Sequence, residues 1–152
     1  MIINILATVI TFFFMEFVAW FTHKYIMHGF LWVLHKDHHK KGKEHTSFFE
    51  LNDYFFVIFA APSILLILVG VNDFTQVYFW IGLGILFYGM AYFFVHDIFI
   101  HQRFKWLRNT KSTYLLGLRR GHKIHHKYLG KEDGECFGML QVPFKYFRQN
   151  KK

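Results

Sequence analysis

Residues 96–101 read HDIFIH and residues 122–126 read HKIHH, and the same pair of motifs occurs earlier as HKYIMH at residues 23–28 and HKDHH at residues 35–39. The chain therefore contains two copies of the pattern H-x4-H followed by H-x2-H-H. These copies use ten of its eleven histidines, and only His45 lies outside them. Neutral imidazole binds zinc, copper, iron and nickel, so the repeated pattern predicts bound metal.

Helical spacing indicates how the histidines are arranged. His35, His38 and His39 are three and four residues apart, so on an α-helix they can point at one place. In each H-x4-H motif the five-residue step is about 140° around an α-helix, so we expect each pair to serve different metals or to approach one site from two directions. Ten imidazoles suggest two metal ions with open positions, whereas a structural zinc is closed by four ligands. Hydrolysis by two redox-inert ions is an alternative, although the chain has no H-E-x-x-H motif.

The composition favours a membrane protein. Of the 152 residues, 53% are apolar and 18% are charged, against about 45–50% and about 25% in a soluble domain. Apolar runs at residues 2–22, 54–71 and 77–95 approach or exceed the length that crosses a hydrocarbon layer of about 30 Å. We therefore predict one all-α integral membrane domain over residues 1–152. The alternatives are buried core helices of a soluble protein and, for the first run, a secretory signal peptide.

The charge distribution predicts the topology. The formal net charge is +8, and all 18 Lys and Arg residues fall within residues 24–43 and 103–152. With three spans, both basic blocks and all four histidine motifs lie on one side, which the positive-inside rule assigns to the cytoplasm. We expect a histidine-rich helical cap on the cytoplasmic face of the inner membrane, in contact with anionic lipid, and no nucleic-acid partner. Residues 130–147 are predicted to be a surface segment.

The four motifs resemble those of the membrane fatty-acid hydroxylase and sterol desaturase superfamily. Within it, HKYIMHGF (23–30), ELNDYFFVIFA (50–60), YFFVHDIFIHQRF (92–104) and GHKIHHKYLGKEDGECFG (121–138) are similar to the bacterial beta-carotene 3-hydroxylases, and the likeness covers nearly the whole chain. The resemblance implies a non-haem di-iron monooxygenase that uses O2 to hydroxylate carbon 3 of each beta-ionone ring. It also implies electron supply from reduced ferredoxin and its NAD(P)H-dependent reductase. Relatives are often drawn with four spans, and three are clear here.

The resemblance also implies a ligand set for two iron ions, with zinc as an adventitious substitute. The ligands would be His23, His28, His35, His38, His39, His96, His101, His122, His125 and His126. Five nearby side chains are candidates for accepting the imidazole N–H bonds: Glu16, Glu50, Asn52, Asp53 and Asp97. Asn52 and Asp53 could equally cap the helix that follows them. The single cysteine, Cys136, excludes a zinc site with two or more cysteines of this chain.

The motifs do not separate this function from that of other histidine-box lipid oxidases. The alternatives are a fatty-acyl or sterol hydroxylase or desaturase, and a carotenoid 4-ketolase. A metal transporter or storage protein belongs to a different class. Transporters place ligands and polar breaks near the middle of their spans, whereas no histidine lies in the middle of a predicted span here.

Overall fold

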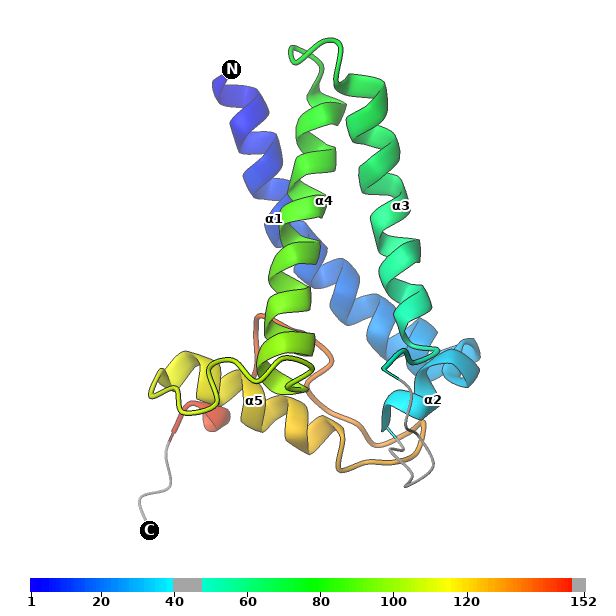
Figure 1. The fold of residues 1–152 in the computed structure, drawn as a ribbon, viewed down its shortest axis with the longest axis vertical. Coiled ribbons are helices and arrows are strands. Elements are labelled where there is room, and N and C mark those ends of the chain that lie inside the picture. Colours follow the sequence, from blue (N-terminus) through cyan, green and yellow to red (C-terminus); the bar gives the residue numbers. More distant parts are fainter. Residues whose placement is uncertain (40–47, 149–152) are drawn as a thin grey trace.

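The computed structural model describes residues 1–39 and 48–148 (Figure 1). All regular structure in these residues is helical, and no β-strand occurs among them, which confirms the predicted all-α class. The elements are α1 (Ile2–Phe21), η1 (Thr22–Phe30), α2 (Trp32–His39), α3 (Asp53–Gly70), α4 (Val77–Phe93), η2 (Phe94–Ile100), α5 (Thr113–His125) and η3 (Phe144–Tyr146). His45 lies outside the described residues.

Three helical stretches of the described chain are long and apolar enough to cross a membrane. They are Ile2–Phe30, Asp53–Gly70 and Val77–Ile100. These stretches confirm the three predicted spans. The first and third extend beyond their predicted ends because α1 continues into η1 and α4 continues into η2.

Helix α4 lies between α1 and α3 and packs against both (Figure 1). Small residues allow close approach on each side. A Cβ added to Gly84 would lie 2.6 Å from the Cβ of Thr11 on α1. On the other side, the Ser63 hydroxyl of α3 donates a hydrogen bond to the Gly82 carbonyl at 2.8 Å. The helices are thus held by close contacts of the kind found between membrane helices.

The two ends of the helical bundle differ in character. The N-terminus and the α3–α4 connection lie at one end, whereas α2 and α5 lie at the other (Figure 1). All four histidine motifs are therefore gathered at one end, as predicted. Between the ends, large apolar side chains such as Phe13 (65% exposed) and Leu65 (62% exposed) face outward. An apolar outer surface of this kind suits contact with lipid.

The prediction of a surface segment at residues 130–147 is wrong for residues 134–140, which are buried or half-buried. Met139 is only 2% exposed and packs in a core cluster with Val95 of η2 and Leu118 of α5. The prediction failed because the polar residues just before this stretch, GKEDGE at 130–135, indicated an exposed segment. The exposed part of the prediction holds for Phe144, which is 85% exposed.

Candidate metal centre

Both H-x4-H motifs lie in helical turns that are wider than those of an α-helix. His23 and His28 belong to η1, and His96 belongs to η2, which His101 follows directly. In such π-type turns the main chain bonds five residues apart, so residues i and i+5 come close. The ring centroids are 5.2 Å apart for His23 and His28 and 4.5 Å apart for His96 and His101. The expectation that the two members of a pair approach from different directions or serve different metals is wrong, because it assumed α-helical winding.

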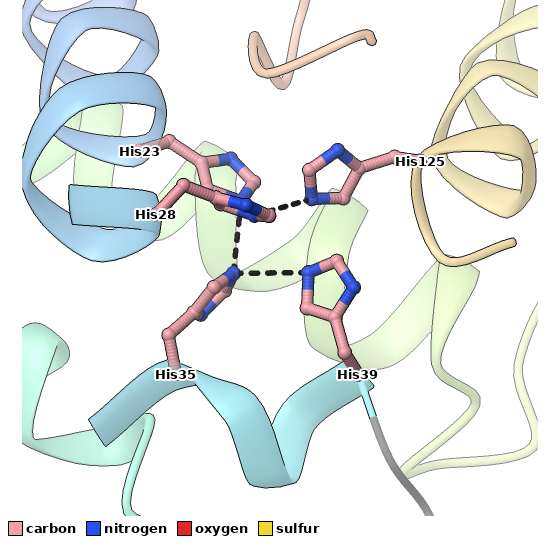
Figure 2. Close-up of side chains that lie close together, drawn as sticks. All are labelled: His23, His28, His35, His39 and His125. Atoms are coloured by element: carbon pink, nitrogen blue, oxygen red, sulfur yellow. Dashed lines mark hydrogen bonds between the residues drawn. The ribbon is translucent and has the colours of Figure 1, made fainter. Parts of the chain in front are cut away.

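Five histidines form one buried cluster, which we call the five-histidine cluster (Figure 2). Its members are His23, His28, His35, His39 and His125, and each offers a ring nitrogen within 4.8 Å of the others. The Nε2 atoms of His23 and His35 are 3.0 Å apart, and those of His28 and His125 are 3.3 Å apart. Helices far apart in the sequence thus direct their imidazoles at one point.

A second group, the four-histidine cluster, consists of His38, His96, His101 and His122. The Nε2 atoms of His38 and His96 are 3.0 Å apart, and those of His101 and His122 are 2.9 Å apart. The His126 ring lies beside this cluster, with its centroid 4.5 Å from that of His122. Its buried Nε2 has no hydrogen-bond partner among the described residues, as expected of an atom available to a metal.

Each H-x2-H-H motif is divided between the two clusters. His35 and His39 belong to the five-histidine cluster, but His38 belongs to the four-histidine cluster. The prediction that these three imidazoles point at one place is therefore wrong. On an α-helix, position i+4 is rotated about 40° from position i in one direction, whereas position i+3 is rotated about 60° in the opposite direction. A helix lying between two clusters can therefore supply both.

The rear nitrogens of the five-histidine cluster all face neutral acceptors. The pairs are His23 Nδ1 with Phe137 O at 2.9 Å, His28 Nδ1 with Lys131 O at 2.9 Å, His39 Nδ1 with Tyr128 O at 3.0 Å, His125 Nδ1 with Glu135 O at 2.9 Å and His35 Nδ1 with Asn52 Oδ1 at 2.7 Å. A carbonyl oxygen only accepts, so Nδ1 carries the proton and Nε2 keeps a lone pair. Lone pairs converging on one buried point fit a cation.

Carboxylates support the four-histidine cluster instead. His38 Nδ1 lies 2.7 Å from Glu50 Oε2, and His96 Nδ1 lies 3.0 Å from Asp97 Oδ2. Arg103 connects these acids, because its Nε is 3.0 Å from Asp97 Oδ1 and its Nη2 is 3.7 Å from Glu50 Oε2. A carboxylate behind an imidazole increases its basicity as a ligand. The surroundings of the two clusters therefore differ in charge. Among the hydrogen bonds described, carboxylates accept from imidazoles only in the four-histidine cluster.

Three of the five predicted acceptors contact an imidazole within residues 1–39 and 48–148, and two contact none there. Glu50, Asn52 and Asp97 are the ones that do. Asp53 instead pairs with the Arg103 guanidinium at 2.7 Å and accepts the Glu50 amide at 3.1 Å. Neither Asn52 nor Asp53 caps α3 in the expected way, since the N-cap residue Asn52 makes no capping bond with its side chain. Glu16 accepts bonds from Tyr88 and from main-chain amides, and from no imidazole of the described residues.

The buried imidazoles supplied by α2 and by the end of α5 are neutral at physiological pH. Burial lowers the pKa of His35 to about 2 and that of His126 to about 2. Burial and the neighbouring imidazoles His39 and His28 lower the pKa of His125 to about 3. Burial also lowers the pKa of His39 to about 4. Neutral imidazole is the form that binds metal, so these side chains hold the required protonation state at pH 7.

Sequence reasoning missed two groups of residues that organise the clusters. The first is the set of main-chain carbonyls between residues 128 and 137, which carry no side-chain signal. The second is Arg103, which sequence reasoning treated only as part of a basic face. Its side chain is 14% exposed and contacts three carboxylates. Asp97 within the third motif, together with Glu50 and Asp53 before the second span, was the available signal for such a counter-ion.

Known proteins similar to this chain include several hydroxylases. The family described as fatty acid hydroxylase matches residues 8–145. A beta-carotene hydroxylase of Pantoea ananas is 42% identical over 140 residues, which cover 92% of this chain and 78% of that protein. A beta-carotene hydroxylase of Pseudescherichia vulneris is 42% identical over 142 residues, covering 92% and 77%. A chloroplastic beta-carotene 3-hydroxylase of Haematococcus lacustris is 40% identical over 134 residues, covering 85% of this chain and 40% of that protein. No solved structure matches this chain significantly.

Proposed function

This chain belongs to the fatty acid hydroxylase family, and we propose that it hydroxylates carbon 3 of carotenoid beta rings, converting beta-carotene to beta-cryptoxanthin and then to zeaxanthin. The observation that carries this proposal is the 42% identity to a beta-carotene hydroxylase over 92% of the chain, which includes all four histidine motifs. Two buried histidine clusters at the end of apolar helices are the site that such chemistry on an apolar substrate requires.

We propose that the two clusters hold two iron ions, one in each, and that zinc is an adventitious substitute. The five-histidine cluster and the four-histidine cluster with His126 supply the ten predicted ligands. Bound iron would supply the O2-dependent oxidation of an unactivated C–H bond. The residues of this chain keep the imidazoles supplied by α2 and α5 neutral, fix which ring nitrogen is bare in the five-histidine cluster, and surround the centre with buried side chains that exclude water.

The substrate would reach the centre from the lipid. A carotene is apolar between its rings, so it partitions into the hydrocarbon layer that the exposed apolar surfaces of α1 and α3 indicate. Helices α2 and α5, which supply histidines to both clusters, lie at one end of these helices (Figure 1). A ring at one end of the substrate would reach this end first. One ring would react at a time, so the mono-hydroxylated product precedes the di-hydroxylated one.

Electron supply by reduced ferredoxin and its NAD(P)H-dependent reductase completes the proposal. The 18 Lys and Arg residues fall in the two sequence blocks that contain or follow the histidine motifs, and we place this side of the spans in the cytoplasm and against anionic lipid at the inner membrane. A surface hollow of about 570 Å³ beside the four-histidine cluster is lined by Arg108, Arg119 and Lys123. Arg119 is fixed there by a 3.0 Å bond to the Phe99 carbonyl. A basic hollow close to the metal ligands suits an acidic electron donor.

The proposed substrate is tested by supplying carotenes to membranes that contain the protein. Beta-carotene and acyclic lycopene are supplied with O2, ferredoxin, its reductase and NAD(P)H, and the pigments are followed over time. We expect beta-cryptoxanthin to appear before zeaxanthin and lycopene to remain unchanged, because lycopene has no ring to position carbon 3. Oxygenated lycopene, or a keto group at carbon 4 as the main product, would instead indicate a 4-ketolase or another lipid oxidase of the same family.

A further inference from the structure

The carboxylate of Glu16 is buried on a membrane helix and binds a distant main-chain segment. Its oxygens accept hydrogen bonds from the amides of Met139 at 2.9 Å, Leu140 at 3.0 Å and Gln141 at 3.1 Å. The Tyr88 hydroxyl of α4 donates a fourth bond at 2.7 Å. A charged group within a membrane span is costly unless it is satisfied, and charge-assisted bonds to several amides are strong. Glu16 therefore holds these amides firmly against α1.

The segment held by Glu16 is the one that orients the five-histidine cluster. We call residues 128–141 the strap. Its carbonyls at Tyr128, Lys131, Glu135 and Phe137 accept the Nδ1 protons of four of the five histidines. Phe137 O, which binds His23, lies only two residues before the first amide held by Glu16. A displacement at the Glu16 contact would therefore reach the His23 acceptor directly.

The strap depends on outside contacts for its conformation. Asp133 and Cys136 have φ angles of 65° and 62°, a left-handed region that non-glycine residues rarely adopt. No regular helix or strand is found in the strap, so its position rests on its contacts. Gly138 shows how closely it approaches α1, because a Cβ added there would lie 2.8 Å from Glu16 Oε1.

We propose that Glu16 is a positioning residue for one of the two metal sites. It anchors the strap, and the strap carbonyls keep Nδ1 protonated and direct the bare Nε2 atoms of the five-histidine cluster at the ion. Among the acceptors found for the four-histidine cluster, none comes from the strap. Loss of the anchor should therefore weaken one ion selectively. This inference rests on the proposed two-metal centre.

The test uses the full chain in detergent, stripped of metal and titrated with Co(II), whose absorption bands report imidazole ligation. In the Glu16→Gln variant we expect one of the two Co(II) ions to bind about 10–100-fold more weakly, the loss typical of ligand-orienting contacts. The affected ion should be the one that His125→Ala weakens, and the ion that His38→Ala weakens should bind normally. Amide hydrogen exchange should accelerate in residues 136–141 but not in α3. Tyr88→Phe, which leaves the three amide bonds in place, should bind both ions like the wild type.

A glycine pair tests the same anchor without altering the carboxylate, in case Glu16→Gln does not fold. Gly138→Ala pushes against Glu16 Oε1, whereas Gly130→Ala, in the same strap, meets nothing within 4 Å. We expect the selective loss in Gly138→Ala and normal binding in Gly130→Ala. Normal affinity for both ions in Glu16→Gln, or equal behaviour of the two alanine variants, would overturn the anchor alone. A wild-type protein that binds no Co(II) would overturn the metal centre, and this inference with it.

Discussion

The main-chain amide of His101 donates a hydrogen bond to the carbonyl of His96, five residues earlier, at a distance of 2.9 Å. This bond closes a turn wider than an α-helical one and places both imidazoles in the same cluster. A second bond of the same five-residue span links the Leu31 amide to the Ile26 carbonyl at 3.0 Å, in a turn that contains His28. The spacing H-x4-H is therefore the spacing of a π-type turn with both ligands on one side.

The first prediction concerns the ligands. His38 and His125 represent the two clusters, so replacing either by alanine removes a nitrogen from one site only. We expect each variant to lose hydroxylation at least 100-fold and to bind about one iron per chain in place of two, because a buried site with one donor missing cannot hold its ion. Product analysis and iron per chain measure the two effects.

His45 provides the control for these variants because it is the one histidine outside the repeated motifs. His45→Ala should bind iron and form product like the wild type. An inactive, folded His45→Ala would add a ligand to the predicted set. Full activity in His38→Ala or His125→Ala would remove that residue from it.

The second prediction concerns Arg103, which contacts Asp53, Asp97 and Glu50. In Arg103→Ala these acids lose their common counter-ion, and the two that bind His96 and His38 lose their fixed positions. We expect about 10–100-fold weaker binding of the ion in the four-histidine cluster, with the other ion little changed. Lys105→Ala removes an exposed cation two residues away and serves as the control. Equal metal binding by the two variants would contradict a positioning role for Arg103.

The repeated spacing of the histidine motifs predicted that their imidazoles would gather at one end of the spans, and the two clusters lie there. The motifs did not predict which cluster each histidine joins, since His35, His38 and His39 separate only when two sites lie on either side of α2. The role of the strap could not be predicted, because every residue has a main-chain carbonyl and the sequence does not mark which carbonyls bind imidazoles. Glu16 was predicted to accept an imidazole N–H bond, but its partners are the amides of residues 139–141, which are more than one hundred residues away in the sequence.

The third prediction concerns the packing of α4 on α1. A Cβ at Gly84 would lie 2.7 Å from the Thr8 carbonyl, which belongs to the main chain and cannot move aside easily. We expect Gly84→Ala to lower the free energy of unfolding by about 1–3 kcal/mol, as overpacking of a close contact does. Gly89→Ala, on the same helix, meets nothing within 4 Å and should have no such effect. Unfolding of both variants in detergent measures the difference, and equal stabilities would exclude the close contact.

The fourth prediction concerns acid. The pKa of His39 is lowered to about 4 and that of His125 to about 3, chiefly by burial, whereas unfolded histidine titrates near 6.5. Between these values the unfolded chain binds more protons than the folded chain. The free energy of unfolding is therefore highest above about pH 6.5 and falls as the pH decreases below it. Each such imidazole contributes a slope of about 1.4 kcal/mol per pH unit. Unfolding of the metal-free chain between about pH 7.5 and about pH 4.5 tests this, and a flat profile would contradict buried neutral imidazoles.

The last prediction concerns the basic hollow beside the four-histidine cluster. Arg108 and Lys123 are exposed there, and Lys123 directly follows the predicted ligand His122. If an acidic ferredoxin docks in this hollow, Arg108→Glu and Lys123→Glu should each slow turnover about tenfold at limiting ferredoxin and low salt, because opposite charges steer association. At saturating ferredoxin, kcat should remain unchanged, since neither side chain is a ligand. Lys127→Glu reverses an exposed cation outside the hollow and is the control.

Salt separates steering from other effects of these charges. For the wild type, raising the ionic strength from about 0.05 M to about 0.5 M should reduce turnover at limiting ferredoxin, and this dependence should be much weaker in the two variants, because screening acts only on charges that contribute. The measurement belongs in bilayers of zwitterionic lipid, where salt cannot act through anionic head groups. Wild-type turnover that is independent of salt under these conditions, or a Lys127→Glu variant as slow as Arg108→Glu, would exclude the hollow as the docking site for the electron donor.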